Sequence, residues 1–191
     1  FKRFPSFLCS CNIIIHEKSP NLIKKQKTNI KFKNVKWVAN LKKINNLPNI
    51  FLANEFFDAI PIKQFLKDKD IWFEKFVHIS NNKKLSFINR KIDIKSIEKK
   101  VNFKISEKQN FIEYSPLGLK YLMDIFKFIK QNKGGLLIVD YGYFAGKMKD
   151  TLQAIYKKKY SKVLDNIGKS DITYNVNFYL VKKIAKNFQD L

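Results

Sequence analysis

The sequence predicts an α/β protein with a parallel sheet, on the basis of three observations. Short stretches typical of strands occur at 13–15, 35–38, 50–53 and 136–139. Helical patterns lie between some of these stretches, and polar residues come directly after three of them. Such a pattern is typical of parallel α/β sheets, which bind ligands beyond the carboxyl ends of their strands. We therefore expect the three polar strand ends to face one crevice.

The amino-terminal elements have clear local signals. The β-branched run at 13–15 predicts the first strand. A helix is predicted to begin at Ser19 and Pro20, because Ser is a good N-cap and Pro is tolerated at the first helical position. Its pattern ends near Asn29. The stretch 50–53 is apolar without interruption, so we expect this strand to be buried on both faces.

The pattern changes in the middle of the chain. Short runs at 72–79 and 85–88 are separated by Ser-Asn-Asn-Lys at 80–83, which predicts a β-hairpin. We interpret 62–113 as a β-rich insertion, and we expect its Lys-rich end at 92–110 to be mobile.

The last part of the chain repeats the earlier signals. Ser-Pro at 115–116 begins a second helix, apolar residues follow at helical spacing, and Gly-Gly at 134–135 ends it. The strand at 136–139 is followed by Asp-Tyr-Gly at 140–142. A final amphipathic helix is predicted from about 178 to 188.

Composition limits the classes of function. Among 191 residues, 45% are hydrophobic and 15% aromatic, which is enough for a folded core, and no stretch approaches the roughly 20 apolar residues of a membrane span. The net charge is +22, but 36 of the 38 basic residues are Lys. Lys, Ile and Asn together make up 79 residues, and AT-rich codons encode all three, so coding bias explains much of the excess of Lys. Nucleic-acid readers favour Arg, so we expect a solvated Lys-rich surface with non-specific polyanion binding and no specific nucleic-acid partner.

Other chemical signals are few. Cys9 and Cys11 are too close to form a disulfide framework and have no second pair to complete a zinc site, so a reducing compartment fits best. The sequence has no Gly-rich phosphate loop and no cluster with metal-ligand spacing, and we predict no metal site.

Polar residues at the strand ends are the candidate site residues. Glu17 follows the first strand, where dinucleotide-type folds place an acid that accepts hydrogen bonds from ribose hydroxyls. An exposed acid at this position is explained equally well by the dipole of the next helix, which favours a negative charge near its start. Asn54, Glu55 and Asp58 follow the strand at 50–53, where carboxylates beside Phe side chains can orient a cationic or polar substrate. Alternatively, Asp58 caps the next turn.

Several blocks of sequence, spread along nearly the whole chain, point to a known family. They are Ile15–Pro20, Ala53–Phe65, Gly134–Gly142, Asp150–Ala154 and Gly168–Phe178, and the Asn-Glu-Phe-Phe-Asp block at 54–58 is the most distinctive. These blocks resemble the MidA-type class I S-adenosyl-L-methionine-dependent methyltransferases. That family includes a mitochondrial complex I assembly factor acting as a protein arginine methyltransferase.

The resemblance implies a Rossmann-like core interrupted by the insertion, with 1–61 and 114–191 in the core. It implies that S-adenosyl-L-methionine is the cofactor, with Glu17 on its ribose and Asn54 orienting cofactor or substrate. It also implies a protein substrate, an arginine of a respiratory complex I subunit. Glu55 and Asp58 would hold its guanidinium while one nitrogen attacks the activated methyl group in line, a step that depends mainly on positioning and needs no metal.

The resemblance also implies a Gly-rich cofactor loop upstream of Ile13, which the chain does not show. We therefore expect a fragment, incomplete at both ends, from a bacterial cytoplasm or, alternatively, a mitochondrial matrix. A non-catalytic assembly or scaffold protein that retains the methyltransferase fold is the alternative function. A basic nucleic-acid-binding protein, motivated only by the net charge, is a third hypothesis.

Overall fold

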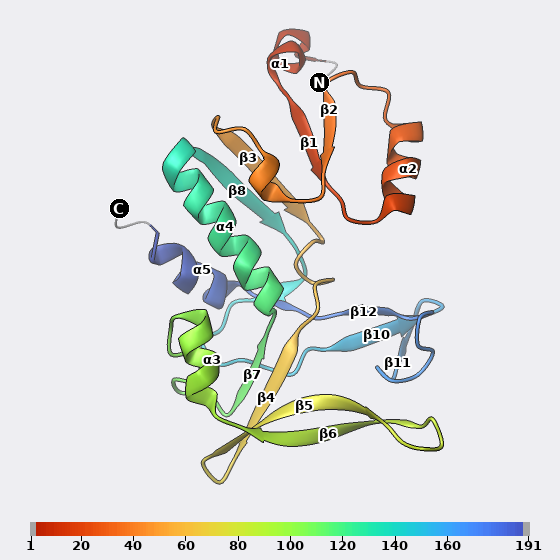
Figure 1. Ribbon diagram of the computed structural model, residues 1–191, viewed down its shortest axis with the longest axis vertical. Helices are drawn as coiled ribbons and strands as arrows, with labels where there is room; N and C mark the ends of the chain where they lie inside the picture. The colour runs from red at the N-terminus through yellow and green to blue at the C-terminus, as the bar shows by residue number, and fades with distance from the viewer. Residues whose placement is uncertain (1–2, 189–191) are drawn as a thin grey trace. The chain divides into compact units, whose positions relative to one another are not determined.

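The computed structural model describes residues 3–188 (Figure 1). The chain divides into two compact units, one up to Leu47 and one from Pro48 onward, and each is described here by itself.

The first unit is a pair of parallel strands with short helices. Ile13 of the first strand lies opposite Val35 of the second. The helix α2 begins as predicted, since the Ser19 hydroxyl caps it by accepting the backbone N–H of Leu22 at 3.3 Å. The short helix α1 was not predicted. The elements are α1 (Pro5–Ser10), β1 (Ile13–His16), α2 (Pro20–Asn29), β2 (Val35–Val38) and the 3-10 helix η1 (Leu41–Lys43).

The second unit contains a parallel pair formed by β3 (Asn49–Asn54) and β8 (Gly134–Val139). The helix α4 (Pro116–Asn132) packs along one face of this pair, where the rings of Phe51 and Phe128 lie 5.5 Å apart (Figure 1).

The other face of the parallel pair is open. Ile50 and Leu52 are 76% and 73% exposed, and Leu137 and Val139 of β8 are also exposed. The expectation that the strand at 50–53 is buried on both faces is therefore wrong. Successive side chains of a strand point to opposite faces, and α4 covers only one of them.

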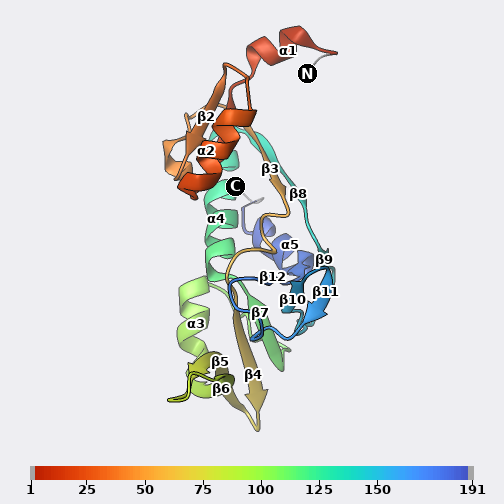
Figure 2. The same cartoon turned by 90° about the vertical axis from the view of Figure 1, so that its right-hand side faces the viewer.

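A four-stranded antiparallel sheet follows β3 in the chain, in the order β6-β5-β4-β7 (Figure 2). The predicted hairpin is confirmed, with Ile79 opposite Leu85. The strands are β4 (Lys63–Asp68), β5 (Ile71–Ile79), β6 (Leu85–Ile92) and β7 (Phe111–Tyr114). They fall almost entirely within the insertion expected at 62–113, whose status as a separate domain stays a prediction.

The Lys-rich end of this region is ordered, contrary to expectation. Asp93 caps the helix α3 (Ile94–Val101) by accepting the backbone N–H of Lys95 at 3.0 Å. Ile97 of the helix and Ile105 after it are buried in the core. Their apolar side chains anchor the segment, so the prediction of a mobile end is wrong.

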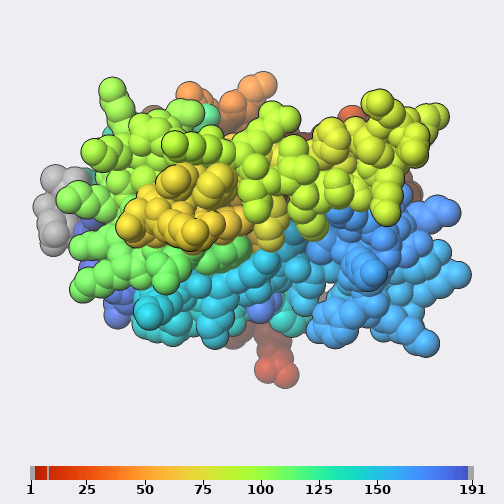
Figure 3. Space-filling view, turned by 90° about the horizontal axis from the view of Figure 1, so that it is seen from below, coloured from red at the N-terminus to blue at the C-terminus, as the bar shows by residue number. Residues whose placement is uncertain are grey.

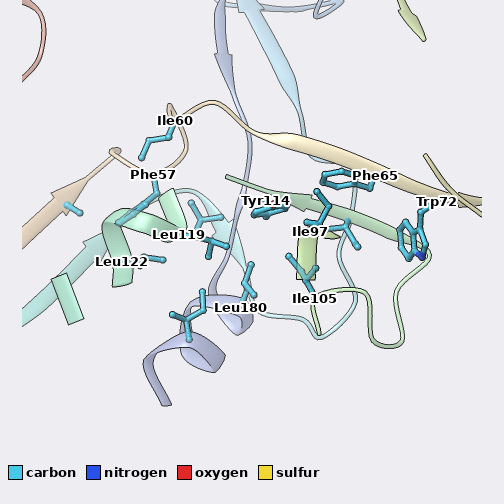
Figure 4. Packing of buried hydrophobic residues seen from close by; sticks show 14 residues of the cluster. Phe57, Ile60, Phe65, Trp72, Ile97, Ile105, Tyr114, Leu119, Leu122 and Leu180 are labelled. Carbon is cyan, nitrogen blue, oxygen red and sulfur yellow. The ribbon is translucent and has the colours of Figure 1, made fainter. Parts of the chain in front are cut away.

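One hydrophobic core joins the antiparallel sheet to the helices of the second unit (Figure 4). Phe65 is fully buried and stacks on Tyr114, with ring centroids 6.0 Å apart. The core includes Trp72, which lies next to Phe65 in Figure 4, and Leu180 of α5 (Phe178–Lys186). The strand-end segment that follows β3 enters the same core through Phe57.

Short strands complete the second unit. Seen from below, the β5–β6 hairpin in yellow-green lies beside the carboxyl-terminal residues in blue (Figure 3). An ion pair at 3.1 Å joins Lys75 of β5 to Asp150. The pair β9 and β13 is parallel, whereas β10 is antiparallel to both β11 and β12. The strands are β9 (Gly142–Tyr143), β10 (Gln153–Tyr156), β11 (Lys159–Ser161), β12 (Asp171–Thr173) and β13 (Val176–Asn177).

Candidate functional site

The carboxyl ends of β3 and β8 lie side by side, as the sequence predicted for two of its three polar strand ends. Asn54 is opposite Val139, the last residue of β8. The backbone N–H of Glu55 donates to the carbonyl of Val139 at 2.8 Å, which closes the strand pair. Asn54 and Glu55 have exposed side chains, so both are accessible to a ligand.

Asp140 fixes the segment that leaves β3. One carboxylate oxygen, Oδ2, accepts the backbone N–H groups of Phe57 at 2.9 Å and Asp58 at 3.3 Å. The other oxygen, Oδ1, accepts the N–H of Tyr141 at 2.9 Å. A single carboxylate therefore ties the turn after β3 to the end of β8, across more than 80 residues of sequence.

Asp58 is buried and has acidic neighbours. Burial raises the pKa of its carboxyl group, and the negative charges of Asp140, Glu55 and Asp171 raise it further. These four carboxylates belong to a chain that has only 16 acidic residues and a net charge of +22. A cation bound among them would relieve their mutual repulsion, so the site favours a positively charged group.

A second segment, residues 174–177, packs against the strand ends. The backbone N–H of Tyr174 donates to the carbonyl of Asp58 at 3.2 Å, and that of Val176 donates to the carbonyl of Tyr141 at 2.8 Å. Gly142 allows this approach, because a Cβ atom there would lie 2.4 Å from the carbonyl oxygen of Val176. The role of this segment was not predicted from the sequence.

The Tyr174 side chain is buried beneath the acidic site. Burial raises the pKa of its hydroxyl well above the usual value, and the charges of Asp140, Glu113 and Asp58 act in the same direction. The Tyr174 hydroxyl therefore remains neutral.

Glu17 belongs to the first unit, at the end of β1. Its Oε1 accepts the backbone N–H groups of Lys18 and Ser19, both at 2.8 Å, and thus supports the start of α2. Its Oε2 makes a long contact of 3.5 Å with Gln26. Since a carboxylate has about four acceptor positions, Oε2 retains the capacity to accept ribose hydroxyls. Both interpretations of Glu17 from the sequence are compatible with this geometry.

Residues 3–188 have no group of three or more His, Cys, Asp or Glu side chains arranged to hold a metal ion. None of the helices in this range is long and apolar enough to cross a membrane.

The comparisons with known proteins define the class. A family model described as "Putative S-adenosyl-L-methionine-dependent methyltransferase" matches residues 1–191, and the chain belongs to this family. The expected family is thereby confirmed. Among the curated relatives, the protein arginine methyltransferase NDUFAF7 of Rattus norvegicus, named as mitochondrial, is 28% identical over 80% of this chain and 34% of its own length. The Xenopus laevis protein of the same name is 26% identical over 97% of this chain and 48% of its own length.

Solved structures confirm the fold class. A Burkholderia thailandensis protein crystallised with S-adenosyl-homocysteine superposes with a TM-score of 0.74 at 16% identity, covering 98% of this chain and 51% of that one. An uncharacterised protein from the same organism gives a TM-score of 0.72 at 17% identity, covering 92% and 50%. The chain spans a third to a half of the length of the relatives it matches.

Proposed function

We propose that this chain forms the substrate-binding part of an S-adenosyl-L-methionine-dependent protein arginine methyltransferase. The observation that carries the proposal is the buried Asp58 carboxylate, grouped with Glu55 and Asp140 at the ends of two parallel strands. A guanidinium group fits this arrangement because it is planar, permanently charged and able to donate several hydrogen bonds to carboxylates.

The proposed reaction gives separate roles to Glu55, Asp58, Asn54 and Glu17. Glu55 and Asp58 hold the guanidinium and direct one of its nitrogens towards the methyl donor, while Asn54 orients substrate or cofactor. Bound S-adenosyl-L-methionine supplies an electrophilic methyl group. The raised pKa of Asp58 makes its carboxylate a better acceptor for the proton that the methylated nitrogen loses. Glu17 would accept hydrogen bonds from the cofactor ribose.

Relatives named as protein arginine methyltransferases support the choice of a protein arginine over other cationic substrates. The family resemblance supports a respiratory complex I subunit as the partner. The mitochondrial names of the relatives support a mitochondrial location, whereas the bacterial source of the structural neighbours supports a bacterial cytoplasm.

The test is binding of a short peptide with a central arginine, followed by methyl transfer from isotopically labelled S-adenosyl-L-methionine. We expect Asp58→Asn and Glu55→Gln each to weaken peptide binding about 10-fold, because a charge-assisted hydrogen bond is worth about 1.5 kcal/mol or more. Asp124→Asn, the same charge change on the exposed side of α4, is the matched control and should have no effect.

Two results would contradict the proposal. Equal binding of arginine and norleucine peptides would show that the carboxylates do not recognise a guanidinium. Peptide binding without any methyl transfer, in a protein that also binds S-adenosyl-L-methionine, would favour the alternative of a non-catalytic assembly protein with a methyltransferase fold.

A further inference from the structure

A buried polar network lies beside the acidic site and has no part in the chemistry described above. Its centre is Glu113 on β7, whose side chain is only 4% exposed. The Glu113 carboxylate accepts Gln64 Nε2 at 2.6 Å, and the backbone N–H and the hydroxyl of Thr151. The same Gln64 amide nitrogen donates to Asp150 at 2.7 Å. No buried side-chain nitrogen or oxygen among the described residues lacks a partner.

The hydrogen bonds of the Thr151 hydroxyl have a fixed direction. The Thr151 hydroxyl donates its proton to Glu113, and the ionised form of that carboxylate can only accept. Its oxygen is then left with lone pairs, and the backbone N–H of Asn175 donates to it at 2.9 Å. Glu113 thus determines how Thr151 is oriented, and Thr151 holds the backbone at Asn175.

The neighbouring residue carries the link into the site. Tyr174 donates its backbone N–H to the carbonyl of Asp58 at 3.2 Å, while Asn175, next in the chain, is held by Thr151. The two consecutive N–H groups therefore join the site on one side to the Glu113 network on the other. Movement at Thr151 would shift Asn175 and with it Tyr174, whose backbone N–H is bonded to the Asp58 carbonyl.

We propose that Thr151, oriented by Glu113, is a positioning residue that holds the Tyr174 backbone against Asp58 and so keeps the substrate-binding carboxylate of Asp58 buried. The assignment of Asp58 to substrate binding rests on the proposed function. Burying a carboxylate costs desolvation energy, and apolar residues of similar volume would stabilise the same site at lower cost. A role in orientation accounts for a carboxylate at this position. It accepts the hydrogen bond of the Thr151 hydroxyl and so fixes the direction of that bond, which an apolar side chain cannot do.

The test compares Thr151→Val, which keeps the shape and removes the hydroxyl, with Thr151→Ser, which keeps the hydroxyl. The first readout is the titration of the Asp58 carboxyl carbon followed by NMR, and the second is amide hydrogen exchange at Asn175. We expect Thr151→Val to bring the pKa of Asp58 down towards its ordinary value as water reaches the carboxyl group. The Asn175 amide should exchange at least 10-fold faster, and Thr151→Ser should restore both readouts.

Thr173→Val is the matched control. It removes a hydroxyl two residues before Asn175 that, among the described residues, accepts a hydrogen bond only from Gln153, at 3.2 Å. It should change neither readout. Glu113→Gln is a second variant that keeps the side-chain volume, and it should also lower the pKa of Asp58.

The outcomes separate this proposal from the proposed function. An unchanged Asp58 titration in both Thr151→Val and Glu113→Gln, or equal effects of Thr173→Val, would overturn the positioning role. Arginine-peptide affinity measured on the same variants should fall about threefold in Thr151→Val and recover in Thr151→Ser. If the unaltered chain binds no arginine peptide, the proposed function fails, and the titration still decides whether Thr151 positions Asp58.

Discussion

Replacing Asp140 with Ala tests the inference that one carboxylate ties the turn after β3 to β8. The change removes the acceptor of the Phe57 and Asp58 N–H groups, which lie 2.9 and 3.3 Å from Oδ2. Taking about 1.5 kcal/mol for each charge-assisted bond gives about 3 kcal/mol. Relief of the repulsion between Asp140 and Asp58 returns about 1 kcal/mol. We therefore expect the free energy of unfolding to fall by about 2 kcal/mol.

Urea unfolding followed by tryptophan fluorescence measures this loss. A Trp37→Phe background restricts the signal to Trp72, which is buried in the core of the second unit. With a slope of about 2 kcal/mol per molar urea, the midpoint should fall by about 1 M. Asp124→Ala removes an exposed carboxylate from α4 and should leave the midpoint nearly unchanged. A loss below about 0.5 kcal/mol in Asp140→Ala would refute the reasoning, because it would show that solvent replaces the carboxylate without cost.

Two further predictions concern pH and backbone geometry. Burial raises the pKa of Glu113 above its ordinary value of 4.5, and the neighbouring charge of Asp150 adds to the effect. Protonated Glu113 therefore contributes its full stabilisation at low pH, and this stabilisation is lost as the pH rises through the raised pKa. Urea midpoints measured from about pH 4 to 8 should fall less steeply with pH in Glu113→Gln than in the unaltered chain. Equal slopes in the two proteins would contradict this. Gly134 has a φ of +123°, and a Cβ atom there would lie 1.9 Å from the carbonyl oxygen of Asn49. Gly134→Ala should cost about 2 kcal/mol or more in the urea assay, whereas Gly135→Ala, with nothing within 4 Å, should cost much less.

Local signals in the sequence predicted most of the elements correctly. Both Ser-Pro pairs begin helices, and in each case the Ser hydroxyl accepts a backbone N–H three residues later. An N-cap and the N–H group that it accepts lie within one helical turn, so this signal can be recognised from neighbouring residues in the sequence. The helix α3 was missed although Asp93, Ile94 and Ile97 carry a cap and an apolar spacing that could have revealed it.

The site was predicted only in part, because its contacts join distant segments. Asn54, Glu55 and Asp58 follow a strand and could be identified by position. The dependence of Asp58 on Asp140 and Tyr174 arises from hydrogen bonds between residues far apart in sequence. The error about the strand at 50–53 has a related cause, since an apolar run does not reveal which face a helix covers.

The open face of β3 and β8 should affect the solubility of this chain and its dependence on salt. Ile50, Leu52, Leu137 and Val139 present an apolar surface that two molecules can bury against each other. The net charge of +22 opposes that encounter at low ionic strength. Salt shortens the screening length from about 10 Å at 0.1 M to about 3 Å at 1 M, and sulfate strengthens apolar association. The chain should therefore be most soluble in dilute buffer and should precipitate early in ammonium sulfate.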